Sequence, residues 1–168
     1  MTSWNGWTPD GAYGLRIEAG AFGELDRICR EAGLVETGGI LVGCYSHDLT
    51  MAIVHEVTPP PSDSRRGHTW FNRGVAGLRD MLAQRWRARD RTHYLGEWHF
   101  HPASIIVPST EDFSQMITIS KADEYKCREP LLVILGSSER EGARALRVFI
   151  CPAGGSPTEV LPMKMRPI

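Results

Sequence analysis

Two histidines with one residue between them, His99 and His101, have the spacing in this sequence that best suits metal chemistry. The stretch from Tyr94 to His101 is predicted to be a strand, where alternate side chains leave the same face of a sheet, so both imidazoles are aimed together. A catalytic zinc ion uses three protein ligands and keeps a fourth position open for water, and a carboxylate is a common third ligand. Asp112 can supply that carboxylate, so the pattern predicts a Zn²⁺ site.

The segment from Ser109 to about Glu124 is predicted to be a helix, with Ser109 as its N-cap and Asp112 in its first turn. There Asp112 would lie near the positive end of the helix dipole. The same two residues also have a purely structural explanation, because a Ser followed three residues later by an acidic residue resembles a capping box. A lone His-x-His pair is weak as well, so neither half of the pattern predicts a metal site by itself.

Two other kinds of metal protein with closely spaced histidines fit this sequence poorly. Cupin-like barrels place a Glu within a few residues of the histidine pair, but residues 102–110 contain no carboxylate. Zinc deaminases need His-x-Glu and a later Pro-Cys-x-x-Cys, and the chain has neither. Deamination is therefore excluded, and a cupin-like site is disfavoured.

The elements around these residues alternate between sheet and helix in one domain of 168 residues. The early strands are joined too tightly for parallel crossovers, so we expect an α/β fold with a mixed, mainly antiparallel, curved sheet flanked by helices. Apart from Tyr94 to His101, the expected strands are 36–43, 51–57, 131–135 and 146–151, and two further helices are expected at 22–32, ending at Gly33, and at 72–89.

The net charge, the N-terminal sequence and the cysteines indicate which partners and which cellular compartment to expect. The formal net charge of -1 gives no overall basic field to attract nucleic acid or an anionic membrane surface. The N-terminus lacks the pattern of a secretory signal, and no apolar run is long enough to span a bilayer, so we expect a cytoplasmic protein. The four cysteines form no C-x-x-C pair and are expected to be reduced thiols packed in the core.

Taken together, Glu36 and the later run His99-x-His101-x(7)-Ser109-x-x-Asp112 resemble the full motif of the JAMM metalloproteases, also called MPN-plus or JAB-domain proteins. The resemblance implies that His99, His101 and Asp112 bind zinc. It also implies that Glu36 accepts a proton from the zinc-bound water, and that Ser109 hydrogen-bonds the oxyanion of the tetrahedral intermediate. In character the chain is similar to compact bacterial deubiquitinase-like members of ubiquitin-like conjugation and antiviral operons.

The reaction that the resemblance implies is hydrolysis of the isopeptide bond between the C-terminal glycine of a ubiquitin-like protein and a target lysine. Expected partners are that protein or its conjugate and E1-like or E2-like conjugation enzymes. A JAMM domain would occupy residues 15–168, after an N-terminal segment at 1–14. Two alternatives stay open: a peptidase that trims the tail of a ubiquitin-like precursor, and a non-catalytic scaffold of the MPN type.

Three features leave questions open at this level. Glu97 shares a strand face with His99 and His101, which makes it a rival of Glu36 for the general base. Trp4, Trp7, Trp70 and Phe71 are candidates for an aromatic surface that grips the partner, although core burial explains them equally well. The basic cluster is expected to be a solvated helix face rather than an RNA site; its members are Arg85, Arg87, Arg89 and Arg91.

Overall fold

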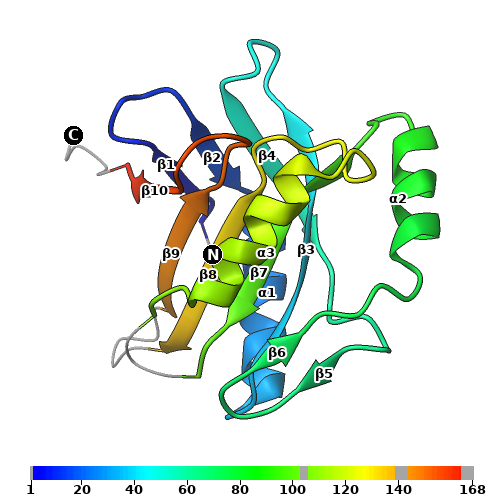
Figure 1. Ribbon diagram of the computed structural model, residues 1–168, viewed down its shortest axis with the longest axis vertical. Helices are drawn as coiled ribbons and strands as arrows, with labels where there is room; N and C mark the ends of the chain where they lie inside the picture. The colour runs from blue at the N-terminus through cyan, green and yellow to red at the C-terminus, as the bar shows by residue number, and fades with distance from the viewer. Residues whose placement is uncertain (1, 103–105, 139–143, 164–168) are drawn as a thin grey trace.

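Eight strands of the computed structural model close into a barrel, and two short ones form a separate hairpin (Figure 1). The structure describes residues 2–102, 106–138 and 144–163. Around the barrel the strand order is β1-β10-β9-β8-β7-β3-β4-β2. The barrel strands are β1 (Trp4–Trp7), β2 (Gly14–Ile17), β3 (Thr37–Tyr45), β4 (Met51–Val57), β7 (His93–Phe100), β8 (Leu131–Ser138), β9 (Arg144–Ile150) and β10 (Thr158–Pro162). The hairpin consists of β5 (Arg65–Arg66) and β6 (Phe71–Asn72).

The expected mixed, mainly antiparallel sheet is confirmed, because only the pairs β2–β4 and β7–β8 of the barrel are parallel. Its closure is a correction, since we expected a curved sheet flanked by helices and not a closed barrel. Strand β1 causes the closure by pairing with both β2 and β10. These strands have only four or five residues, too few for the alternation that identifies a strand in a sequence.

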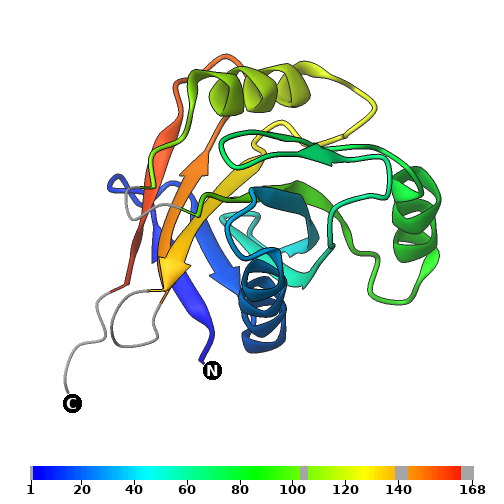
Figure 2. The same cartoon turned by 90° about the horizontal axis from the view of Figure 1, so that it is seen from below.

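Two hydrophobic clusters lie on opposite faces of the central strands. Helix α1 (Ala19–Ala32) packs Leu25 and Ile28 into one cluster, which also takes Leu41 of β3. Helix α3 (Thr110–Lys121) packs Met116 into the other, with Ile40 of β3. Figure 2 shows α1 and α3 on opposite sides of the sheet. The face of β7 that turns toward α3 is therefore the one that can meet Asp112.

Helix α2 (Leu78–Arg87) is shorter than the predicted helix at 72–89. Its N-cap is Gly77, with φ of 76°, a left-handed conformation that interrupts a helix. Before it, Asn72 belongs to β6, and Val75 is 64% exposed. The helix lies at one edge of the molecule and buries none of its residues (Figure 1). Across the described ranges, no helix is both long and apolar enough for a membrane crossing.

Candidate metal centre

Successive side chains of strand β7 point to opposite faces of the sheet. Trp98 and Phe100 enter the cluster that includes α1, so His99 between them faces α3. Only 4% of the surface of His99 is exposed. His101 lies just after the strand, but its backbone N–H still donates to the carbonyl of Leu135 on β8 at 2.8 Å. The two imidazoles therefore leave the same end of β7 on the same side.

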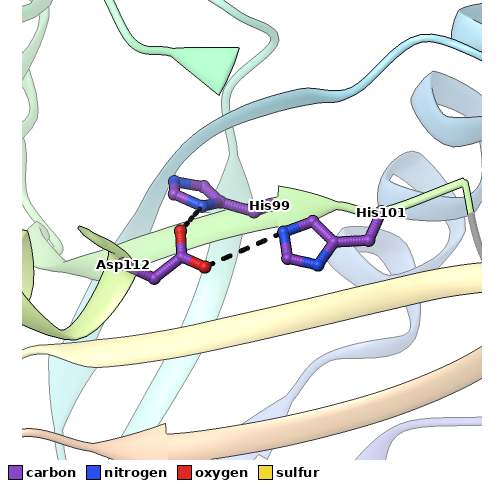
Figure 3. A group of neighbouring side chains, drawn as sticks. All are labelled: His99, His101 and Asp112. Carbon is purple, nitrogen blue, oxygen red and sulfur yellow. Dashed lines mark hydrogen bonds and ion pairs between the residues drawn. The ribbon is translucent and has the colours of Figure 1, made fainter. Parts of the chain in front are cut away.

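His99, His101 and Asp112 meet in one cluster, as Figure 3 shows. Nδ1 of His99 lies 2.7 Å from Oδ1 of Asp112, and Nε2 of His101 lies 3.9 Å from Oδ2. Each residue offers one ligand atom, and these atoms all lie within 4.8 Å of one another. Two imidazoles and a carboxylate are a donor set that zinc takes with an open fourth position. The residues present therefore fit a zinc ion.

The charges of the cluster are strongly coupled. Burial acts to raise the pKa of Asp112, but the hydrogen bond and charge of His99 outweigh it and lower the pKa to about 2. Burial likewise acts to lower the pKa of His99, but Asp112 and Glu97 favour the protonated ring and raise the pKa to about 9. Burial lowers the pKa of His101, which favours the neutral imidazole that a metal requires.

Ser109 and Asp112 form the capping box that their spacing suggested. Oγ of Ser109 accepts from the Asp112 backbone N–H at 3.0 Å, and Oδ2 of Asp112 accepts from the Ser109 backbone N–H at 2.7 Å. The structural interpretation is therefore correct, and it does not compete with the chemical one. The cap holds the Asp112 carboxylate so that its other oxygen reaches His99.

Glu36 lies immediately before β3, next to this cluster. Thr37 is opposite Phe100 and Gly38 is opposite His99, so the antiparallel register carries Glu36 toward His101. Its backbone N–H donates to the carbonyl of Gly67 in the β5–β6 hairpin at 2.9 Å. Burial raises the pKa of the half-buried Glu36 carboxyl, and the negative charge of Asp112 raises it further. A carboxyl with a raised pKa suits proton transfer near neutral pH.

Glu97, the rival for the general base, is fully buried and already paired. Its Oε1 accepts from Nε and Nη2 of Arg73 at 2.9 and 2.7 Å, and its Oε2 accepts from Nε2 of Gln115 at 3.3 Å. Burial acts to raise the pKa of Glu97, but His99 and Arg73 outweigh it and lower the pKa. A carboxylate held in this way is poorly placed to take up a proton during a reaction.

Two further residues, Arg73 and Gly38, adjoin the cluster, and Arg73 was not recognised from the sequence. Arg73 fell within the predicted helix, and nothing in its surroundings marks it as the partner of a residue on β7. Gly38 makes room for His99: a Cβ there would lie 2.9 Å from Cδ2 of His99 and 2.7 Å from Cε1 of Phe71. The four aromatic candidates do not form one surface, since Trp4 packs against the core while Phe71 packs on His99.

A family model described as prokaryotic homologs of the JAB domain matches residues 19–148. The chain belongs to this JAB family. The resemblance that the motif suggested is therefore confirmed, and the expected α/β fold agrees with it.

Two relatives of this JAB protein carry the name "CD-NTase/cGAS isopeptidase". The one from Enterobacter hormaechei subsp. hoffmannii (strain UCI 50) is 41% identical over 145 residues, 86% of this chain and 79% of that protein. The one from Pseudomonas aeruginosa (strain BWHPSA011 / Pa011) is 32% identical over 130 residues, 77% of each. The solution structure of a protein from Desulfitobacterium hafniense matches with a TM-score of 0.58 at 20% identity, covering 88% of both chains, which shows a shared fold.

Proposed function

We propose that this JAB protein is a zinc-dependent isopeptidase. It would hydrolyse the bond between the C-terminal glycine of a ubiquitin-like protein and a lysine of the target. The observation that carries the proposal is the cluster of His99, His101 and Asp112 beside Glu36, a carboxyl with a raised pKa. The relatives named as isopeptidases support the reaction class.

Each residue has a distinct part in this reaction. His99, His101 and Asp112 would hold the zinc ion, which supplies a water with a pKa lowered to about 7 and polarises the scissile carbonyl. Glu36 would take the proton of that water and later give it to the departing lysine amine. Its raised pKa suits both steps, because the carboxyl must gain and lose the proton at similar pH.

Ser109 would donate a hydrogen bond to the oxyanion. Its Oγ already accepts one hydrogen bond from Asp112, but a hydroxyl that accepts still carries a proton to donate. The residue is exposed at the start of α3, where substrate can reach it. The capping bond holds the Ser109 oxygen in place before substrate arrives, and the hydroxyl proton stays free to donate.

The relatives' name supports a proposal for the substrate. Their name gives CD-NTase/cGAS as the protein on which they act, and we extend this to the present chain. The conjugated target would then be a CD-NTase, and the protein removed from it would be ubiquitin-like. E1-like and E2-like enzymes that build the conjugate would be its functional partners.

The test uses the purified full chain and two substrates that share one ubiquitin-like protein. In the first the C-terminal glycine is linked to a lysine side chain, and in the second it is fused to a peptide through the α-amine. We expect chelator-sensitive cleavage of the lysine-linked substrate, restored by zinc. Cleavage of the fused substrate alone would point to a precursor-processing peptidase, and no cleavage by zinc-loaded protein would point to a scaffold.

A further inference from the structure

Behind the metal cluster lies a buried ion pair, Arg73 with Glu97, that the proposed reaction does not use. The two side chains are 4% and 0% exposed. Arg73 makes two further hydrogen bonds. Its Nη1 donates to the carbonyl of Gly74 at 2.8 Å, and its Nη2 also donates to the hydroxyl of Tyr125 at 3.3 Å. Burying such a pair costs free energy, and a hydrophobic pair of similar size is often equally stable. Stability alone therefore does not account for it.

Glu97 stands on the opposite side of the His99 ring from Asp112. Its Oε2 lies 3.7 Å from Nε2 of His99, while Nδ1 of the same ring contacts Asp112. Among the residues that the structure describes, Nε2 of His99 has no hydrogen-bond partner although it is buried. The ring therefore lies between two carboxylates, with Glu97 facing its second nitrogen.

Arg73 connects this arrangement to the β5–β6 hairpin, because it directly follows Asn72, the last residue of β6. The hairpin contacts the candidate site at two further points. The Phe71 ring packs edge-on against His99 with centroids 5.6 Å apart, and the Gly67 carbonyl accepts from the Glu36 backbone N–H. Anchoring Arg73 therefore fixes a hairpin that touches both a ligand and the proposed base.

We propose that Arg73 and Glu97 are positioning residues for the metal site. Glu97 orients the His99 imidazole, Arg73 holds the Glu97 carboxylate in place, and the pair ties the β5–β6 hairpin to His99. This proposal rests on the proposed zinc site. Groups that contact the free side of a zinc-binding histidine fix the orientation of its ring, and their loss lowers metal affinity by about 10- to 100-fold.

The experiment measures zinc affinity by competition with a chromophoric chelator for the wild type, Glu97→Gln, Arg73→Met and the double variant. The matched control is Glu56→Gln, because Glu56 also accepts two hydrogen bonds from one arginine, Arg85, at 2.7 and 2.9 Å. That pair is 37–40% exposed and joins α2 to β4, away from the metal cluster. Cobalt substitution reports ligand geometry through its visible spectrum, and thermal unfolding reports folding.

We expect Glu97→Gln to bind zinc about 10- to 100-fold more weakly and to shift the cobalt spectrum, with Glu56→Gln unchanged in both. Glu97→Gln leaves Arg73 charged and buried, so the double variant, which removes the charge, keeps the test valid if the single variant misfolds. Zinc affinity equal to the wild type in either folded variant would overturn the proposal. Absence of isopeptidase activity in the wild type would instead overturn the proposed function and leave the affinity comparison intact.

Discussion

The Asp112 carboxylate makes two interactions at once: one oxygen completes the N-terminal cap of α3, and the other contacts His99. This double use predicts how the metal-free protein responds to pH. His99 has its pKa raised from 6.5 to about 9, so its contribution to stability is complete below pH 6.5 and is lost as pH rises through 9. Asp112 has its pKa lowered from 3.8 to about 2, so its contribution is complete above pH 3.8 and is lost as pH falls through 2.

The stabilisation by this pair is therefore largest between pH 3.8 and 6.5. We expect the difference in unfolding free energy between chelator-treated wild type and Asp112→Asn to be greatest in that window and to shrink above it. Chemical denaturation at several pH values measures this difference. A difference that stays constant from the acid window to above pH 9 would show that His99 and Asp112 do not share a proton.

Gly38 leaves no room for a side chain. In Gly38→Ala the new Cβ would lie 2.5 Å from the Trp98 carbonyl oxygen and 2.9 Å from Cδ2 of His99, and the backbone oxygen cannot move easily. We expect a loss of about 1–3 kcal/mol in unfolding free energy together with weaker zinc binding, because His99 must shift. Gly20→Ala, a control in α1 with open space around it, should instead gain ~0.5–1 kcal/mol. Equal effects of the two changes would contradict this explanation.

At the scale of the elements, the β5–β6 hairpin lies beside the metal cluster, where a protein substrate can contact it. Trp70 is 52% exposed next to Phe71, which covers His99. We expect Trp70→Ala to raise KM several-fold with the melting temperature unchanged, since a large exposed aromatic side chain beside the site can anchor a partner. Trp86→Ala is the matched control, because Trp86 on α2 is 55% exposed but is not part of the hairpin. An unchanged KM in well-folded Trp70→Ala would end this idea.

Elements that depend on neighbouring residues could be predicted from the sequence, whereas those that depend on distant residues could not. The start of α3 was predictable because its capping box involves only Ser109 and the first helical turn. The interval 72–77 was predicted as helix but is not helical, because Gly77 adopts a left-handed conformation and Arg73 turns inward to Glu97. The capping box is a local sequence pattern and can be recognised. The ion pair of Arg73 with Glu97 joins residues 24 positions apart, and no local sequence pattern indicates it.

At the scale of the whole molecule, the same distinction applies to the metal cluster and the barrel. The motif grouped His99, His101 and Asp112, and these side chains lie together in the structure because strand alternation and a helix cap determine where they point. Closure of the barrel was missed because β1 depends on pairing with β10, more than 150 residues later in the chain. Long-range pairing between very short strands has no periodicity to reveal it.

The closed barrel predicts that stability and metal binding can be separated. Strand β1 pairs with β2 and β10, whereas the metal cluster depends on β7 and α3. Removing residues 1–7 should therefore cost roughly 3–5 kcal/mol, the scale for losing a large packed side chain such as Trp4, while the folded fraction still binds one zinc ion. Calorimetry and metal analysis test this prediction. Loss of zinc with unchanged stability would contradict it.

The most direct test of the central claim is the activity of Glu36→Gln, measured with its zinc content, on a lysine-linked conjugate of the ubiquitin-like protein. The substitution keeps the shape of the side chain but removes its ability to take a proton. Because general acid–base catalysis contributes about 10²- to 10⁴-fold, we expect a loss of that size with a full complement of zinc and normal folding. Wild-type activity in Glu36→Gln, with activity abolished in zinc-loaded Glu97→Gln, would contradict the account.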